Sequence, residues 1–462
     1  MSAVIQHSTV QPASTGATLP AGADTARFAF DGAGATACAQ FAAHVRALAA
    51  RLPAAAYAVN LCEDRYRFLV AFCAVAVRGQ ANLLPPSRTR AAIDEVRAQY
   101  PDSYCIGDGD ACGCDALRPD GHFVALPATL PGLDGAPLHI DDAAVVAIGF
   151  TSGSTGTPSA NAKTLGSFRT STAQNLAALA SLWPAGTVPD VVATVPPQHM
   201  YGVELSVMLP LLGGAAVHRG RPFFPQDIAR ALEEATAPRL LVSTPVHLRA
   251  LLESGVALPP LAGIVTATAP LPPELAAEAE SRFGCEVRET FGSTETCIFA
   301  FRRTARDAAW TPYPGVRLQP RPDGTLVSAP HLPQPVLLAD LVGLQDDGRF
   351  VLHGRQADLL EIAGKRASLA DLTRRLLALP GVRDGAMFQL DPGAGGVRRI
   401  AAVFASDTLD EAAVREALRR SVDPVFLPRP LRRVAALPRN ETGKLPREAL
   451  LRLLRGDAAA GS

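Results

Sequence analysis

The sequence predicts an α/β protein with more than one domain, on three observations. The chain has 462 residues, more than one ordinary core accommodates, and 48% of them are hydrophobic. Short apolar runs alternate with helical periodicity over residues 37–283, the order typical of a mainly parallel sheet. After Thr311 short strands with Pro/Gly turns follow. Helical periodicity then returns at residues 369–378 and 410–420, which indicates a small separate α+β unit.

Periodicity and the residues that break it predict the elements in order. Apolar residues at helical spacing predict the helices, and Pro53 and Gly79 end the first two patterns. The helices are expected at residues 37–52, 66–77, 90–100, 166–182, 226–235, 247–253 and 273–283. Short apolar runs between them predict strands. The strands are expected at residues 59–62, 104–106, 144–150, 190–195, 240–243 and 263–267.

Changes in composition predict the domain boundaries. Residues 1–25 hold few bulky apolar side chains and are expected to be a flexible leader. Residues 26–355 are expected to form an N-terminal domain and residues 356–462 a small C-terminal domain. The last segment carries 18 Lys+Arg and 13 Asp+Glu, a balance of 18 − 13 = +5. This surplus would suit an acidic partner, although a solvated surface explains it equally well.

Whole-chain properties argue against several classes of protein. The 44 basic and 44 acidic residues balance, which argues against a chain-wide nucleic-acid binder. No signal peptide is visible and the apolar runs are too short for a transmembrane segment, so a cytoplasmic location is expected. Cys112 and Cys114 form the one close cysteine pair in the sequence. Without a second pair nearby, it is a weak candidate for zinc.

A Ser/Thr/Gly loop at residues 150–158 directly follows a predicted strand. Its two glycines permit tight curvature, and its backbone N–H groups and hydroxyls suit phosphate oxygens. It is not a Walker A loop, because no Gly-Lys-Ser/Thr closes it. Taken alone, such a segment is more often a plain loop than a nucleotide site.

Several further motifs accompany this loop. An aromatic residue shortly before Thr294 and Glu295 suits a purine, and the carboxylate suits Mg²⁺ on the phosphates. The motifs, in chain order, are Thr266-Ala267-Thr268-Ala269-Pro270-Leu271, Phe291-Gly292-Ser293-Thr294-Glu295, Ala339-Asp340, Gly354-Arg355, Gly364-Lys365-Arg366 and Pro438-Arg439-Asn440-Glu441-Thr442-Gly443-Lys444.

In the order and spacing of these motifs, the chain resembles the adenylate-forming (ANL) superfamily of acyl-CoA synthetases, luciferase-like enzymes and peptide-synthetase adenylation domains. The likeness covers roughly residues 60–447. It implies a large N-terminal domain of α/β subdomains with a small β-barrel-like subdomain, followed by a mobile α+β C-terminal domain. It also implies ATP and Mg²⁺ as cofactors. A carboxylate would attack the α-phosphorus of ATP and release pyrophosphate, after which a thiol would displace AMP.

The resemblance implies a role for each motif residue. The phosphates would be bound by Thr151, Ser152, Gly153, Ser154, Thr155 and Gly156. The rest of the nucleotide would be bound by Thr268, Ala269, Pro270, Phe291, Gly292, Ser293, Asp340, Arg355 and Arg366. Thr294 would contact the α-phosphate, Glu295 would be the metal ligand, and Lys444 would bridge the two reacting groups. The acyl pocket would be bordered by His199, Tyr201 and Gly202, the thiol channel by Gly364, and the hinge by Ala357 and Asp358.

Two details narrow or limit the resemblance. Many relatives place lysine where this chain has Ser159, and the nearest lysine is Lys163. Lys163 either serves the pyrophosphate from a shifted position or is a solvated residue at a helix start. The shifted lysine, residues 60–68 and the Gly-Lys-Arg segment resemble freestanding ligases of aryl-polyene pigment pathways. Those enzymes load a small hydroxybenzoate-type acid onto an acyl carrier protein. An acyl-CoA synthetase that uses free CoA, for aryl or fatty acids, and a catalytically silent nucleotide-binding homologue are the alternatives.

Overall fold

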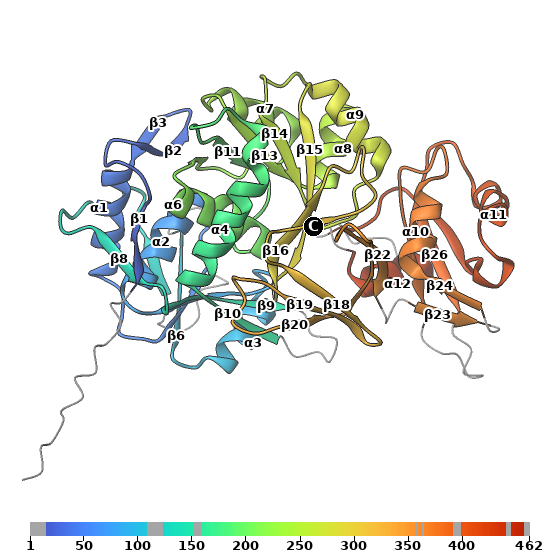
Figure 1. Cartoon of the computed structure of the whole chain (residues 1–462), viewed down its shortest axis with the longest axis horizontal. Coiled ribbons are helices and arrows are strands. Elements are labelled where there is room, and N and C mark those ends of the chain that lie inside the picture. Colours follow the sequence, from blue (N-terminus) through green and yellow to red (C-terminus); the bar gives the residue numbers. More distant parts are fainter. Residues whose placement is uncertain are drawn as a thin grey trace, which may run out of the picture. The chain divides into compact units, whose positions relative to one another are not determined.

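The computed structural model describes residues 15–108, 123–151, 159–355, 359–362, 365–390, 399–439 and 445–456 (Figure 1). The chain divides into two compact units. Unit 1 is Met1–Leu241 with Ser293–Cys297, and unit 2 is Val242–Gly292 with Ile298–Ser462.

The first sheet of unit 1 has six strands in the order β10-β9-β5-β4-β6-β7. The strands are β4 (Tyr57–Asn60), β5 (Ala81–Leu84), β6 (Ser103–Asp108), β7 (Phe123–Leu126), β9 (Val145–Thr151) and β10 (Ser159–Thr164). All neighbours pair in parallel except β9 and β10, which are antiparallel. Helix α2 (Arg65–Val77) begins at Asp64, whose carboxylate accepts the Arg67 N–H as a cap. Helix α3 (Arg90–Gln99) is capped in the same way by Thr89.

The second sheet of unit 1 has the order β13-β11-β12-β2-β3. Its strands are β2 (Arg27–Asp31), β3 (Gly34–Ala37), β11 (Asp190–Ala193), β12 (Ala216–His218) and β13 (Arg239–Ser243). The helices of this part are α1 (Cys38–Ala49), α4 (Leu165–Leu179) and α7 (Pro225–Glu233). The sequence predicts these helices within a few residues, because each has a clear apolar stripe or a capping residue.

The expected leader over residues 1–25 is wrong in its second half. Strand β1 (Gly16–Leu19) pairs antiparallel with β8 (Leu138–Asp141), and Leu19 is buried. The N–H of Ala21 also donates to the carbonyl of Leu211. The partner strand lies more than a hundred residues away, so the local composition of this polar segment contains no sign of the pairing.

A short π-helix in unit 1 has no counterpart among the predicted elements. Helix α5 (Met200–Gly202) continues into the π-helix η3 (Val203–Met208) and then into α6 (Leu209–Gly213). Helix α4 packs against η3 and α6 (Figure 1). π-Turns are rare and occur frequently at functional sites. This one directly follows the His199–Tyr201–Gly202 segment.

The first part of unit 2 contains strands in the order β17-β16-β15-β14. They are β14 (Gly263–Thr266), β15 (Glu286–Ser293), β16 (Cys297–Arg302) and β17 (Thr311–Pro312), with helices α8 (Pro245–Ser254) and α9 (Pro273–Phe283). The expected barrel-like subdomain consists of a three-stranded and a two-stranded sheet. These are β18 (Arg317–Arg321), β19 (Gly324–Ser328) and β20 (Val336–Leu338), and then β21 (Asp340–Leu344) and β22 (Phe350–Arg355).

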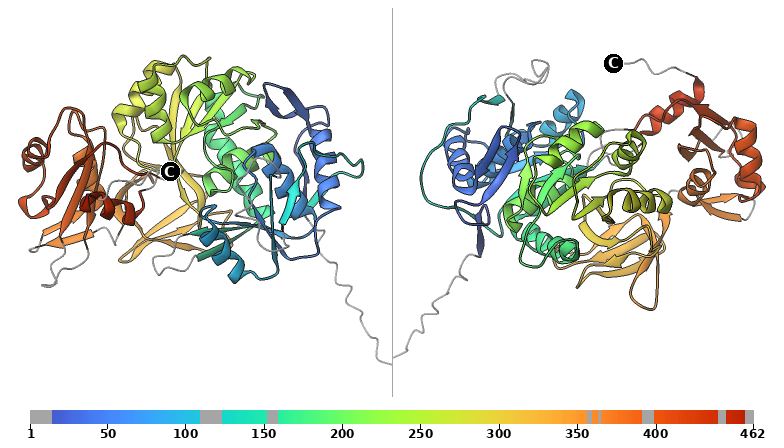
Figure 2. Two further views of the ribbon diagram at one scale, coloured as in Figure 1. Left: turned by 180° about the vertical axis from the view of Figure 1, so that it is seen from behind. Right: turned by 90° about the horizontal axis from the view of Figure 1, so that it is seen from above.

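The C-terminal part of unit 2 has two hydrophobic cores of its own. Its elements are β23 (Leu359–Ile362), β24 (Lys365–Ser368), α10 (Leu369–Leu377), β25 (Asp384–Gln389), β26 (Ile400–Ala405), α11 (Glu411–Arg419), β27 (Leu431–Val434) and α12 (Arg447–Arg455), coloured orange to red in Figure 2. Phe404 and its neighbours pack against α10 and α11. Val403, which points to the other face of the same sheet, packs with Leu450 of α12. The predicted small α+β unit is therefore confirmed.

Among the described residues, no helix is both long and apolar enough to cross a bilayer.

Candidate active site

The strand that precedes the predicted phosphate loop is present and ends where the loop begins. Thr151 is the last residue of β9 and is half-buried. Ser159, the first residue of β10, pairs with it. The two ends of the loop segment therefore lie opposite each other on adjacent strands. The loop residues Ser152, Gly153, Ser154, Thr155 and Gly156 lie outside the described residues.

A tight turn at residues 293–297 carries Thr294 and Glu295. Strand β15 extends through Ser293, so the Phe291–Ser293 part of the motif lies on this strand. The Ser293 N–H donates to Thr296 Oγ1 at 3.0 Å, and the Thr296 N–H donates to Ser293 Oγ at 3.2 Å. Cys297 then has φ 57°, which non-glycine residues rarely adopt. These two hydrogen bonds and the left-handed residue define the shape of the turn.

The turn lies directly against strand β9. A Cβ atom added to Gly149 would come within 2.7 Å of Thr294 Cγ2, so the close approach requires glycine at this position. Gly149 and Thr151 are two residues apart on β9, and their side-chain positions therefore face the same side of the strand. The structure thus brings Thr294 to the strand that leads into the predicted phosphate loop.

Lys163 is buried and does not begin a helix. It lies on β10 and is 4% exposed, so the expectation of a solvated residue at a helix start is wrong. Its ammonium donates to the backbone carbonyl of Glu295 at 2.6 Å. The reason for the difference is strand β10, which the sequence alone does not reveal because residues 159–164 show no alternation of apolar side chains.

The side chain of Glu295 fits a divalent cation. It is half-buried on a tight turn. Within the described part of the chain, its carboxylate has no hydrogen bond and no ion pair. A carboxylate oxygen is the ligand type that Mg²⁺ prefers, and Mg²⁺ in nucleotide sites typically uses only one or two protein carboxylates. Consistently, no group of three or more His, Cys, Asp or Glu side chains that could hold a metal occurs in the described residues.

In unit 2, the segment after β14 carries a strained residue. Thr268 has φ 78°, and its Oγ1 is buried without a hydrogen-bond partner among the described residues. Ala269 is half-buried and Pro270 is exposed. The segment is held by Glu289, whose carboxylate accepts the N–H of Leu271 at 3.2 Å. A strained backbone and an unused hydroxyl are typical of ligand-facing positions.

Glu289 is a supporting residue that the sequence analysis missed. Burial raises the pKa of its carboxyl group, while Arg302 and Thr304 act in the opposite direction. Arg302 lies 2.7 Å away, and Thr304 donates a hydrogen bond at 2.6 Å. Glu289 lies two residues before Phe291, so its closeness to the motif was the sequence signal that could have identified it. Its partners, however, come from two other segments, at Leu271 and at Arg302 and Thr304.

Phe291 packs in an aromatic cluster on one side of β15. Its ring centroid lies 5.3 Å from that of Phe299 and 5.2 Å from that of Trp310. Phe350 completes the cluster at 6.1 Å. Because Phe291 is only half-buried, part of the ring remains accessible. Gly292, which follows it, is exposed.

Asp340 and Arg355 are paired by the strand register. They lie opposite each other at the open ends of β21 and β22. Thr325 Oγ1 donates to the Asp340 carbonyl at 2.7 Å and fixes the start of β21. The backbone of Arg366 lies on β24, opposite Glu361. Four further predicted site residues lie outside the described residues, namely Ala357, Asp358, Gly364 and Lys444.

The predicted acyl-pocket residues lie at the start of helix α5. His199 is half-buried and precedes the helix, while Tyr201 is 8% exposed. A Cβ atom on Gly202 would come within 2.0 Å of the Pro196 carbonyl oxygen, so the fold of this segment requires glycine there. Arg65 ties the segment to α2, because its guanidinium donates to the carbonyls of Ala193 and Val195.

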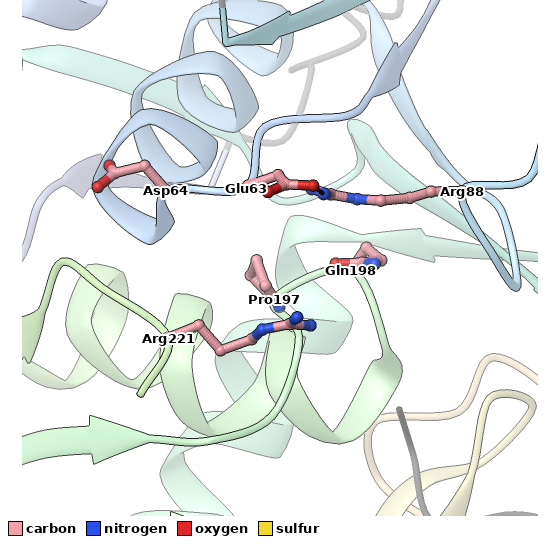
Figure 3. A pocket seen from close by; sticks show the side chains of 6 residues that line it. All are labelled: Glu63, Asp64, Arg88, Pro197, Gln198 and Arg221. Carbon is pink, nitrogen blue, oxygen red and sulfur yellow. Dashed lines mark hydrogen bonds and ion pairs between the residues drawn. The ribbon is translucent and has the colours of Figure 1, made fainter. Parts of the chain in front are cut away.

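A polar cavity of about 260 Å³ adjoins this segment (Figure 3). Its lining residues are Glu63, Asp64, Arg88, Pro197, Gln198 and Arg221. Glu63 and Arg88 form an ion pair of 2.6 Å on one side, and Gln198 and Arg221 lie on the other side. Gln198 Oε1 is buried without a hydrogen-bond partner in the described structure. The sequence analysis missed this cavity because its walls come from separate loops.

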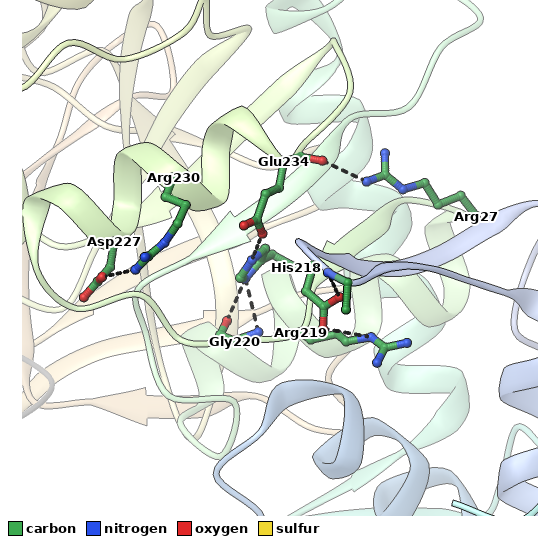
Figure 4. Close-up of polar contacts among 9 residues, drawn as sticks. Arg27, His218, Arg219, Gly220, Asp227, Arg230 and Glu234 are labelled. Atoms are coloured by element: carbon green, nitrogen blue, oxygen red, sulfur yellow. Dashed lines mark hydrogen bonds and ion pairs between the residues drawn. The ribbon is translucent and has the colours of Figure 1, made fainter. Parts of the chain in front are cut away.

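A second cavity lies near β12 and α7. Charged side chains around it bind one another, as Figure 4 shows. His218 Nε2 lies 2.9 Å from the Glu234 carboxylate, and Arg27 donates to the Glu234 carbonyl at 3.1 Å. Asp227 and Arg230 pair with each other on α7. None of these residues belongs to a predicted motif, and the contacts hold β12 and α7 to β2.

Comparisons with known proteins agree with this geometry. A family model described as "AMP-binding enzyme" matches residues 33–325. The sulfoacetate–CoA ligase of Cupriavidus necator is 29% identical, over 74% of this chain and 76% of its own. The probable 2-succinylbenzoate–CoA ligase of Mycobacterium tuberculosis is 27% identical, over 73% and 93%.

Solved structures show the same fold. ATP-bound MatB from Rhodopseudomonas palustris superposes with a TM-score of 0.78 at 20% identity, over 94% of this chain and 96% of that one. The o-succinylbenzoate CoA synthetase MenE from Bacillus subtilis gives 0.74 at 16% identity, over 90% and 93%. With the matched family model and the relatives above, the chain belongs to the AMP-binding enzyme family, within the adenylate-forming superfamily, and is an ATP-dependent acid–thiol ligase.

Proposed function

We propose that this ligase activates a small aromatic, hydroxybenzoate-like acid as its acyl adenylate and transfers the acyl group to the phosphopantetheine thiol of an acyl carrier protein. The observation that supports adenylation best is the turn at residues 293–297. It holds the carboxylate of Glu295, which has no partner among the described residues, and brings Thr294 against the strand that ends at Thr151. This arrangement provides a carboxylate for a metal ion next to the start of a phosphate-binding loop.

In the first step, an oxygen of the substrate carboxylate attacks the α-phosphorus and pyrophosphate leaves. Glu295 would hold Mg²⁺, which supplies charge neutralisation on the phosphates when bound. The role proposed for Thr294 is a hydrogen bond to the α-phosphate. Lys444 would stabilise the negative charge that grows between the carboxylate and the α-phosphate. In the second step, the thiol attacks the acyl carbon and AMP leaves.

The remaining nucleotide contacts are proposals of the same kind. Thr268, with its unused hydroxyl, and Phe291, with a partly accessible ring, would bind adenine. Asp340 would accept hydrogen bonds from the ribose hydroxyls, with Arg355 opposite it in the register. Movement of the C-terminal domain about Ala357 and Asp358 would convert the enzyme from the adenylation step to the thiol-transfer step, as in domain-closure mechanisms generally.

Relatives support an aromatic acid. Ligases named for 4-coumarate in Rhodobacter capsulatus and for 2-succinylbenzoate in Mycobacterium tuberculosis are among the matches. The buried aromatic side chain of Tyr201 in the predicted acyl-pocket segment agrees with a flat substrate. The surplus of 18 basic over 13 acidic residues after residue 355 suits an acidic carrier protein.

Free CoA is the second candidate thiol. Relatives named as CoA ligases favour it, whereas a match named as a fatty acid–acyl-carrier-protein ligase, MmaC of Mycobacterium marinum, covers 27% of this chain. A catalytically silent homologue is disfavoured because Glu295 is in a position that suits a metal ligand.

The test is a panel of acids assayed for pyrophosphate release, each with CoA or with phosphopantetheinylated carrier protein. We expect the highest kcat/KM with a hydroxybenzoate, and acyl transfer to the carrier protein. A preference for long alkyl acids would contradict the aromatic substrate. Efficient thioester formation with CoA and none with carrier protein would identify free CoA as the thiol substrate.

A further inference from the structure

Lysine is scarce in this chain, and its positions are informative. Of the 44 basic residues, three are lysines, Lys163, Lys365 and Lys444, and the other 44 − 3 = 41 are arginines. Other hydrogen bonds from buried or half-buried cationic side chains to backbone carbonyls are donated by arginine, as at Arg65 and Arg239. Arginine binds several acceptors at once, whereas a lysine ammonium is a compact point charge. A lysine at position 163 therefore places a compact positive charge beside the acceptors that it reaches.

One such acceptor is the carbonyl of Glu295. The Lys163 Nζ lies 2.6 Å from it, across 132 residues of sequence. Lys163 is 4% exposed, so the donor end of this hydrogen bond is buried. A charge-assisted hydrogen bond in such surroundings is stronger than a neutral one. The carbonyl belongs to the residue whose carboxylate is the proposed metal ligand.

Strands β9 and β10 together support the turn. Asn161 pairs with Gly149, and Lys163 pairs with Ala147. Lys163 on β10 therefore lies two residues from the position opposite Gly149 on β9. Gly149 leaves room for Thr294, and Lys163 binds the carbonyl of Glu295. The hairpin that flanks the phosphate loop is therefore also the support of the turn.

Glu204 is a buried acidic residue of unit 1 that, like Lys163, acts electrostatically on Cys297. Glu204 on the π-helix is 1% exposed and accepts hydrogen bonds from Ser171 and Asn175. Burial, and then the charge of Glu204, raise the pKa of the Cys297 thiol, whereas Lys163 lowers it, and the pKa is about 12 under all these influences together.

We propose that Lys163 is a positioning residue for the metal-binding turn, setting the place of the Glu295 carboxylate and hence the affinity for the divalent cation bound with ATP. This inference rests on the proposed function, in which Glu295 holds that cation. Removing the ammonium leaves the Glu295 carbonyl without its donor and frees the turn to move. The carboxylate then has to be ordered when the metal binds, which weakens metal binding.

The experiment compares Lys163→Met, Lys163→Arg and the control Arg239→Met. The control removes a half-buried cation from the carbonyls of Leu232 and Ala235, away from the turn. Binding of Mn²⁺ with a non-hydrolysable ATP analogue is measured by electron paramagnetic resonance. We expect at least tenfold weaker Mn²⁺ binding in K163M, substantial recovery in K163R and no change in R239M.

Two further readouts separate positioning from a general structural role. In the ligand-free protein, hydrogen exchange of the Thr296 amide should be faster in K163M than in the wild type. In the pyrophosphate assay, the Mg²⁺ concentration for half-maximal rate should rise tenfold, with kcat at saturating Mg²⁺ within threefold of the wild type. If K163M does not fold, Lys163→Gln, which keeps a neutral donor, replaces it.

The inference and the proposed function fail in different ways. Unchanged Mn²⁺ affinity in K163M, or equal weakening in K163M and R239M, overturns the positioning role. Equal weakening in K163M and K163R also overturns it, because a cation at this position would then not matter. If the wild type releases no pyrophosphate with any acid, the proposed function fails. The Mn²⁺ binding measurement still decides the role of Lys163 in that case.

Discussion

Gly149 is the residue at which the structure makes its sharpest steric demand near the predicted phosphate loop. An added methyl group would lie 2.7 Å from Thr294 Cγ2, closer than real Cβ contacts allow. We expect Gly149→Ala to displace Thr294 and to lower kcat/KM for ATP about tenfold, or ~1.4 kcal/mol. The control is Gly132→Ala, whose added Cβ would meet Ala43 at an ordinary 3.6 Å. Wild-type kinetics in G149A would show that Thr294 does not contact the nucleotide.

Lys444 is the second residue with a defined expectation. We expect Lys444→Ala to slow adenylate formation by about 10²-fold or more, roughly 3 kcal/mol, as for other removed charge stabilisers. Thiol transfer from a preformed adenylate should change much less, since the charge it stabilises belongs to the first step. Single-turnover measurements of the two half-reactions separate them. Equal losses in both steps would contradict this assignment.

At the level of elements, helices α1 and α2 meet at a histidine with a shifted proton affinity. His44 Nδ1 lies 2.7 Å from the Tyr66 hydroxyl. Burial, and then the charge of Arg219, lower the pKa of His44 below its ordinary 6.5. The folded state therefore binds this proton less readily than the unfolded chain. The contribution of His44 to the free energy of unfolding is therefore complete above the ordinary pKa. It is lost as the pH falls from the ordinary pKa through the lowered pKa of the folded state.

The corresponding experiment is urea unfolding at about pH 7.5 and about pH 5. We expect the free energy of unfolding of the wild type to fall more between these values than that of a His44→Gln variant. Equal losses in both proteins would mean that His44 does not contribute to the pH dependence.

The elements also show how far the sequence predicts this structure. Helices such as α9 (Pro273–Phe283) were predicted at their observed ends, because local periodicity and Pro/Gly punctuation encode them. Strand β10 was missed because its side chains do not alternate between apolar and polar, and the pairing of β1 with β8 was missed because the two strands are far apart in the sequence. The motif residues were found by spacing. The tie from Lys163, the support by Glu289 and the polar cavity depend on contacts between distant segments.

On the scale of the whole molecule, the C-terminal part is expected to fold without the rest. Its sheet is covered on both faces, with Phe404 in one core and Val403 in the other. A polypeptide of residues 356–462 should therefore unfold in one cooperative transition. Phe404→Ala should destabilise it by about 3–5 kcal/mol or unfold it, because the change empties the buried centre.

The matched control in that fragment is Glu416→Ala, at an exposed position on α11, which should stay within about 0.5 kcal/mol of the parent. Circular dichroism during denaturation measures both. A fragment without a cooperative transition would show that its cores need the remainder of unit 2.

The tie between Lys163 and the Glu295 carbonyl has a consequence for the history of the family. A lineage that lost the lysine would also need a new partner for that carbonyl, and a lineage that filled Gly149 would have to move Thr294. Substitutions at positions 149, 163 and 294 should therefore be correlated among the relatives of this chain. Ser159, at the first position of β10, should vary independently of them. During evolution, the residues that support the turn at residues 293–297 would then be conserved or replaced together.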